Sequence, residues 1–105
     1  MSSRRKATIP KSLRRAVWEH HHGKNHSMGP CYVCRTSISI WDFECGHVVA
    51  ESNGGETTLN NLRPICGVCN KSMGTMDLEE YKKTYFSHLH TLDRYYLYLR
   101  GLMVF

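Results

Sequence analysis

The sequence contains Cys31-Tyr-Val-Cys34 and Cys66-Gly-Val-Cys69, and these two CxxC pairs bracket the segment Cys45-Gly-His-Val-Val-Ala-Glu-Ser-Asn-Gly-Gly55. Two CxxC knuckles supply four thiolates, the number that closes one tetrahedral Zn²⁺ site. Such a site has no open coordination position, so its role would be structural. We therefore expect Cys31, Cys34, Cys66 and Cys69 to hold one structural zinc ion per chain and to fix the polar segment between them.

Length and composition favour a single small domain. The chain has 105 residues, of which 41% are hydrophobic. A core of this size is adequate but small, and a structural zinc would add its binding free energy to folding. No apolar run approaches the roughly 18 residues that a membrane-spanning helix needs, so we expect no membrane association.

Cysteine usage indicates a reducing compartment. Five cysteines is an odd number, and the sequence shows no secretory signal, whereas a secreted disulfide framework normally uses an even number. A redox-active CxxC would predict one such motif beside a βαβ pattern, and here there are two. We expect metal-binding cysteines in an intracellular protein of the cytoplasm or nucleus.

The charge of the chain is concentrated near its N-terminus. Residues 1–35 carry eight Lys and Arg side chains against one acid, a net +7 where the whole chain has +5. Such a basic segment favours binding to nucleic acid. A solvated tail and a cleaved mitochondrial presequence are the alternatives, but Val17 and Trp18 look like core residues that cleavage would remove. The residues expected to contact DNA phosphates here are Arg4, Arg5, Lys6, Lys11, Arg14 and Arg15.

The first half of the chain predicts an arm, a helix and two strands. Residues 1–8 form a flexible basic arm, and residues 9–23 a basic helix with Pro10 in its first turn and Gly23 as its C-cap. The adjacent His20, His21 and His22 are expected to be solvated at the negative end of this helix. A loop is expected at 23–30, and two short strands with a kink between them at 37–50.

The second half predicts a turn, a strand and helices. Asn53-Gly54-Gly55 is typical of a turn, and a strand is expected within 57–65, leading into the second CxxC pair. A helix should begin near Cys69 or Asn70 and be interrupted at Gly74. The apolar spacing over 77–105 predicts an amphipathic helix, or a pair of helices broken near Thr91.

These motifs together resemble a known family. The stretches Glu44-Cys-Gly-His-Val-Val-Ala-Glu-Ser-Asn-Gly-Gly and Leu59-Asn-Asn-Leu-Arg-Pro-Ile-Cys-Gly-Val-Cys-Asn70 are similar to the HNH endonucleases of zinc-knuckle type, including those of large DNA viruses and phages. The resemblance covers about 31–76. It implies an α+β fold: a small zinc-stabilised ββα-metal domain with an N-terminal basic helix and a C-terminal helical extension over 77–105.

The resemblance also implies a function, metal-dependent cleavage of DNA, with a role for each matching residue. His47 would be the general base that activates water, and Asn61 would brace the loop that bears it. Asn70 would hold a catalytic Mg²⁺ or Mn²⁺ ion that stabilises the leaving 3′-oxygen. Arg63 and Lys71 lie beside these residues and are expected to contact phosphates, or else to be surface charges. The expected substrate is double-stranded DNA, and the enzyme is expected to be a monomer or homodimer.

The sequence departs from the family pattern at three positions. Gly46 stands where many members have an acidic or histidine ligand for the catalytic ion, Asn70 stands at the last letter in place of histidine, which is a common variant, and Met73 stands where a lysine is frequent. The ion would then rest on Asn70, waters and DNA oxygens, which implies weak affinity.

Two further interpretations remain open at this stage. A RING-type module would recruit Cys45 and His47 to a second zinc site, but the sequence offers six of the eight ligands that fold needs. Otherwise Cys45 is expected to be a small buried residue. A non-catalytic zinc module that binds DNA through its basic helix is the other alternative.

Overall fold

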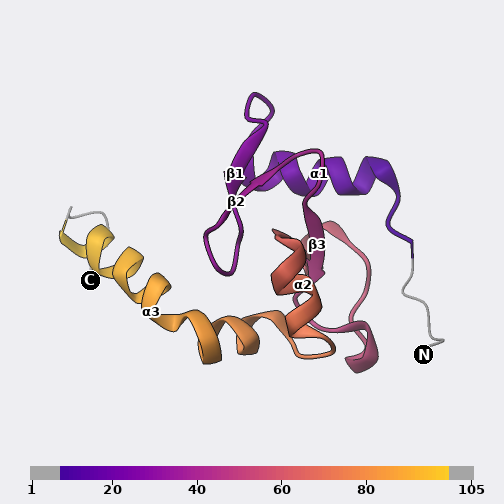
Figure 1. Cartoon of the computed structure of the whole chain (residues 1–105). Coiled ribbons are helices and arrows are strands. Elements are labelled where there is room, and N and C mark those ends of the chain that lie inside the picture. The colour runs from indigo at the N-terminus through magenta and orange to yellow at the C-terminus, as the bar shows by residue number, and fades with distance from the viewer. Residues whose placement is uncertain (1–7, 100–105) are drawn as a thin grey trace.

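The computed structural model describes residues 8–99, with side chains described as far as His90 (Figure 1). Its elements are, in chain order, α1 (Lys11–His22), β1 (Met28–Pro30), β2 (Ser37–Ser39), β3 (Glu44–His47), η1 (Glu51–Asn53), η2 (Leu59–Asn61), β4 (Leu62–Ile65), α2 (Gly67–Met73) and α3 (Leu78–Leu99). The strands form two separate antiparallel pairs. The predicted α+β class is therefore confirmed.

Helix α1 is amphipathic and packs on the core through Val17 and Trp18, which are fully buried. The Trp18 indole Nε1 donates a hydrogen bond to the carbonyl of His26 at 2.7 Å, which fixes the loop after the helix. The helix begins just after Pro10, which serves as its N-cap. It ends at Gly23, whose φ of 84° is costly for other residues. The predicted C-cap is thus observed, while the helix starts two residues later than expected.

Strands β1 and β2 form a hairpin around the first CxxC pair. Gly29 lies opposite Ile38, and the Cys31 amide donates to the Thr36 carbonyl at 2.7 Å, closing the knuckle between the strands. Strand β1 was expected to be loop, since Met-Gly-Pro has little intrinsic preference for a strand. The knuckle brings its two flanks side by side, and this tertiary constraint makes the strand.

The second pair of strands, followed by α2, forms the ββα unit. β3 pairs with β4 so that Glu44 lies opposite Ile65 and His47 opposite Leu62. Helix α2 follows β4 directly and packs against β3 (Figure 1). It begins at Gly67, earlier than predicted, because the Cys66 sulfur caps it by accepting the amide of Cys69 at 3.3 Å.

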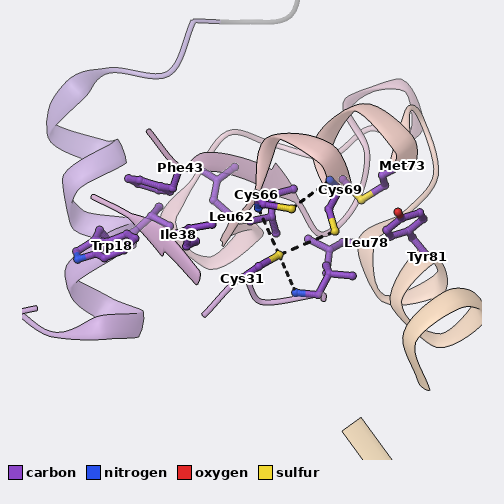
Figure 2. Close-up of a cluster of buried hydrophobic side chains, with 13 residues drawn as sticks. Trp18, Cys31, Ile38, Phe43, Leu62, Cys66, Cys69, Met73, Leu78 and Tyr81 are labelled. Carbon is purple, nitrogen blue, oxygen red and sulfur yellow. Dashed lines mark hydrogen bonds between the residues drawn. The ribbon is translucent and has the colours of Figure 1, made fainter. Parts of the chain in front are cut away.

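The hydrophobic core surrounds the cysteines. Figure 2 shows Trp18 and Phe43 at one end of the cluster and Met73 and Tyr81 at the other, with the cysteine sulfurs between them. The cysteines of the two CxxC pairs and the apolar core are therefore one structural unit.

Helix α3 begins inside the core and then extends away from it (Figure 1). Leu78 and Tyr81 are buried, so the first turns of the segment expected as an extension over 77–105 contribute to the core. The helix is broken at Phe86, where φ is −133° and ψ is 19°, and not near Thr91. Within residues 8–99 no helix is long and apolar enough to cross a membrane.

The histidines at the end of α1 correct one prediction. His21 and His22 were expected to be solvated, but both are half-buried, and the Nε2 atom of each is buried without a hydrogen-bond partner in the described structure. The His22 ring packs edge-on against Trp18, with centroids 4.4 Å apart. Burial, followed by the charge of Arg63, lowers the pKa of His21 to about 4. Both histidines lie one helical turn after a core residue, Val17 or Trp18, which is the sequence signal for their burial.

Candidate active site and zinc centre

The four cysteines of the CxxC pairs converge on one point. Their sulfur atoms all lie within 4.8 Å of one another. Cys31 and Cys69 are 4.0 Å apart, and Cys34 and Cys66 are 3.8 Å apart. Tetrahedral zinc with Zn–S bonds of about 2.3 Å requires sulfurs about 3.8 Å apart. The four residues therefore fit a zinc ion in both donor type and spacing.

Backbone amides prepare this centre for thiolates. The Cys31 sulfur accepts the amides of Val33 at 3.4 Å and of Cys66 at 3.3 Å. Burial alone would raise the pKa of Cys31, but these and neighbouring hydrogen bonds outweigh it and lower the pKa. Burial and the adjacent sulfurs raise the pKa of Cys69. Several thiolates so close together need a cation to balance their charge, which a zinc ion would provide.

Cys45 and His47 belong to no cluster of three or more metal-ligating side chains in the described part of the chain. Within the described residues, the four knuckle cysteines are the one group of three or more Cys, His, Asp and Glu side chains placed to hold a metal. Burial raises the pKa of Cys45 to about 11, so this thiol is neutral near pH 7 and packs as a small half-buried side chain. The RING-type interpretation is not supported.

His47 is the last residue of β3, and its side chain is 11% exposed. Its Nε2 atom lies 3.0 Å from Thr57 Oγ1 and 3.8 Å from Glu51 Oε2. Strand pairing fixes the backbone of His47, and these contacts fix its ring. The imidazole is thus held at the point where the chain leaves the sheet and enters the 48–57 loop.

Asn61 ties the two ends of the 48–57 loop together. Its side-chain oxygen accepts the Val49 amide at 2.9 Å, and its Nδ2 donates to the carbonyls of Val49 at 3.1 Å and Glu56 at 2.8 Å. The Asn61 carbonyl also accepts the Val48 amide at 2.8 Å. Asn61 therefore holds Val48, the residue after His47, through its carbonyl, and Glu56, the residue before Thr57, through its side chain. The part of Asn61 in cleavage stays a prediction.

Asp77 anchors the same loop from the start of α3, a contact that sequence reasoning missed. Its Oδ1 accepts the Ala50 amide at 2.9 Å and the Asn53 side-chain amide at 3.1 Å, and these two bonds lower the pKa of Asp77. The available signal was an Asp immediately before an amphipathic run, a common helix start. That signal predicts a cap but not which loop the carboxylate also holds.

Gly55 lets the loop fold tightly on itself. Its amide donates to the Ala50 carbonyl at 3.0 Å. A Cβ atom at this position would lie 1.7 Å from the Val49 carbonyl oxygen, so no other residue fits without moving the backbone. The turn predicted at Asn53-Gly54-Gly55 therefore depends on close backbone approach as well as on the left-handed Gly54, with φ of 91°.

The predicted ion ligand, Asn70, lies on α2, the helix that packs against β3. It is half-buried, and the neighbouring Lys71 is exposed. Gly46 has no side chain that could supply a second ligand, and a Cβ there would lie 2.5 Å from Ile65 Cδ1 and 3.2 Å from Leu78 Cδ1, so a larger residue would require these side chains to shift. Core side chains therefore lie against this face of β3 at Gly46, and the role of Asn70 as an ion ligand stays a prediction.

The basic residues predicted to contact DNA differ in their surroundings. Lys11 is exposed, and Arg15 is exposed and paired with Glu19 at 2.9 Å. Arg14, in contrast, donates to the Phe43 carbonyl and stacks on the Phe43 ring at 4.1 Å. It therefore has a structural role that the sequence did not reveal. The other three predicted DNA contacts belong to the N-terminal arm and lie outside the described residues: Arg4, Arg5 and Lys6.

Arg63, on β4, is also held by the protein. Its guanidinium donates to the carbonyls of Asn60 at 3.1 Å and Leu62 at 2.9 Å. It lies 5.6 Å from the centre of the Tyr32 ring. These contacts fix the direction of the side chain, so a phosphate contact would be made by a preorganised guanidinium.

A family model described as HNH endonuclease matches residues 31–86, which is more than half of the chain. The chain therefore belongs to the HNH endonuclease family, and the resemblance found in the sequence is confirmed. The match extends beyond residue 76, in agreement with the packing of Leu78 and Tyr81 in the core. No curated protein and no solved structure matches the chain significantly. Family membership supports a nuclease-type function and association with nucleic acid.

Proposed function

We propose that this protein is a zinc-stabilised, metal-dependent endonuclease that hydrolyses phosphodiester bonds of double-stranded DNA. The observation that supports this most strongly is the position of His47. It ends a strand of the ββα unit, its ring is hydrogen-bonded, and the loop after it is fixed by Asn61. A rigid, partly shielded imidazole is suited to proton transfer near neutral pH.

In this proposal His47 takes the proton from the attacking water. A general base must hold its nitrogen within hydrogen-bond reach of that water, so fixing the ring matters as much as its basicity. Strand pairing and the Thr57 contact fix the ring, and Asn61 prevents the loop from drifting away from it.

Asn70 is proposed to hold the divalent ion. Its side-chain amide offers a hard oxygen ligand of the kind that Mg²⁺ and Mn²⁺ accept, with waters and phosphate oxygens completing the coordination. When bound, the ion supplies compensation for the negative charge that develops on the leaving 3′-oxygen. The four-cysteine centre has no open position for this task, so the two metals have separate roles.

DNA binding is proposed to use the exposed cations of α1 and α2, represented by Lys11, Arg15 and Lys71, with the oriented guanidinium of Arg63. Phosphate contacts of this kind release counterions, so affinity should fall steeply with salt. Arg4, Arg5 and Lys6 would add to the same effect.

A plasmid-nicking assay tests this function. Zinc-loaded protein is incubated with supercoiled DNA in Mg²⁺, in Mn²⁺ and in EDTA, beside His47→Ala and Asn70→Ala. The control is His88→Ala, on the exposed side of α3. We expect cleavage with either ion, a loss of about 100-fold or more in His47→Ala, and a comparable loss in Asn70→Ala that higher ion concentration partly restores. Equal rates for His47→Ala and the control would refute the proposal.

The environment of Gly46 favours one second candidate, a non-catalytic zinc module that binds DNA. Core side chains occupy the space where many family members place a second ion ligand. This candidate predicts DNA binding that His47→Ala leaves unchanged and no strand cleavage at any Mg²⁺ or Mn²⁺ concentration. The same assay, run with a binding measurement, separates the two.

A further inference from the structure

We propose that Trp41 is a base-stacking contact, so that the DNA this protein binds includes an unpaired base beside the duplex. This inference rests on the DNA binding in the proposed function and not on cleavage. The chain has two tryptophans, and they lie in opposite surroundings. The Trp18 ring is fully buried, whereas Trp41 is 83% exposed, the most exposed of the large hydrophobic side chains that the structure describes.

The turn that carries Trp41 is held by hydrogen bonds. The Asp42 amide donates to the Ser39 carbonyl at 3.2 Å, which closes a β-turn. The Ser39 hydroxyl oxygen accepts the Trp41 amide at 3.1 Å and donates its own hydrogen to Asp42 Oδ1 at 3.0 Å. On either side of Trp41, Ile40 packs against the core and Phe43 is buried. A fixed stretch of backbone therefore holds the indole in solvent.

An exposed indole presents a flat apolar face that a nucleobase can cover. Stacking of bases on aromatic side chains is a recurrent way to bind nucleic acid, and it tolerates any base because every base has such a face. In a continuous duplex, neighbouring bases already cover both faces of each base. The ring can therefore stack only on a base that is unpaired, as in a single strand or at a bulge.

Cations lie close to this turn. Arg14 of α1 donates to the Phe43 carbonyl, two residues after Trp41, and the chain between β2 and β3 runs alongside α1 (Figure 1). A guanidinium has five N–H donors, of which the Phe43 carbonyl takes one. The loop before β1 also contacts the turn, because the Ser27 carbonyl accepts one of its amides at 2.9 Å. This loop carries the exposed Lys24. The surroundings of Trp41 are therefore suited to the phosphates next to a stacked base.

Two acids on the same segment indicate that the ring contacts a base and not the phosphate backbone. Asp42 and Glu44 are both exposed, and their negative charges repel phosphates. A base is uncharged, so contact through its face avoids this repulsion. We expect the contribution of Trp41 to affinity to be nearly independent of salt, whereas phosphate contacts by Lys11 and Arg15 should weaken steeply as salt rises.

Fluorescence tests the stacking directly, because Trp18 is buried and Trp41 is exposed. Zinc-loaded protein without Mg²⁺ or Mn²⁺ is titrated with a single strand, with a fully paired duplex, and with the same duplex carrying an unpaired base. We expect the first and third to quench the long-wavelength emission and to shield it from acrylamide, and the fully paired duplex to have little effect. Trp41→Phe should remove this emission, which identifies its source.

Binding affinity for the duplex with the unpaired base is compared among four variants. Trp41→Ala should bind it about 5- to 150-fold more weakly, the range for one base–aromatic stack. Trp41→Phe should keep most of the affinity, whereas Trp41→Leu, which keeps apolar bulk without an aromatic face, should lose about as much as Trp41→Ala. Tyr85→Ala, at an aromatic residue that is 59% exposed on α3, is the control and should bind as wild type does.

Unchanged affinity of Trp41→Ala for all three oligonucleotides would overturn the inference. A blue shift of the Trp41 emission with protein concentration alone would also overturn it, because a second copy of the chain would then cover the ring. If wild type shows the expected quenching but cleaves no DNA with Mg²⁺ or Mn²⁺, the proposed nuclease function fails while the stacking contact stands. If wild type cleaves DNA and Trp41→Ala binds as well as wild type, the stacking contact fails alone.

Discussion

Replacing Asn61 by Ala should both destabilise the domain and uncouple His47 from its loop. The substitution removes three side-chain hydrogen bonds, two to the backbone of Val49 and one to the carbonyl of Glu56. At a net value of about 1 kcal/mol each, and because water partly replaces them at this half-exposed site, the expected loss is about 2 kcal/mol. That is a substantial share of the roughly 5–15 kcal/mol typical of domains.

Urea denaturation at fixed free zinc concentration measures the stability loss, since metal binding contributes to apparent stability. Nicking kinetics measure the functional loss, which we expect to be about 100-fold in kcat because misplacement of the base by about 1 Å has that effect. Asn61→Asp keeps the acceptor for Val49 but turns a carboxylate toward two carbonyls, so it should be at least as damaging. Asn60→Ala, at the exposed neighbouring side chain, is the matched control. If Asn61→Ala matched Asn60→Ala in its urea unfolding midpoint and in kcat, the side-chain hydrogen bonds of Asn61 would have no role in stability or cleavage.

Three further predictions concern the loop, the metal and pH. Gly55→Ala should lower the free energy of unfolding by about 3 kcal/mol, because the new Cβ would lie 1.7 Å from the Val49 carbonyl oxygen. In the control, Gly67→Ala, the new Cβ meets nothing within 4 Å, so urea denaturation should show almost unchanged stability. Cys66→Ser should abolish stoichiometric zinc binding and cooperative unfolding, as followed by metal analysis and circular dichroism, and a preserved cooperative transition would contradict a structural zinc. Stability should fall as the pH drops from 6.5 toward 4, because His21 binds a proton in the unfolded chain at its ordinary pKa of 6.5 but in the folded protein only at about 4. In His21→Gln this part of the pH dependence should disappear, and an unchanged slope would show that His21 is not the group responsible.

Sequence reasoning succeeded where one local rule decides the structure. The CxxC spacing predicted the four-sulfur cluster, and Gly23 predicted the end of α1. In both cases a residue type or a spacing carries its own physical constraint, whatever the remainder of the chain does. The ββα unit was implied by the family resemblance, and β3, β4 and α2 form it.

The features that sequence reasoning missed depend on contacts between distant segments. The Asp77 carboxylate was identifiable only as a helix start, yet it also holds the backbone of Ala50 from another element. The break in α3 falls at Phe86, which packs against the buried core, and not at the β-branched Thr91. The contacts of His47 with Glu51 and Thr57 form only because the 48–57 loop folds back on itself at Gly55. No periodic pattern in the sequence predicts that fold of the loop.

The proposed cleavage requires a base and an ion ligand that face the same phosphodiester, so the most direct measurement is the paramagnetic broadening caused by Mn²⁺. Titration of Mn²⁺ into zinc-loaded protein should broaden the Asn70 side-chain amide and the His47 ring signals most strongly. Excess Mg²⁺ should reverse the effect, and Asn70→Ala should abolish it. Strong broadening of one of these residues while the other stays sharp would contradict a shared site.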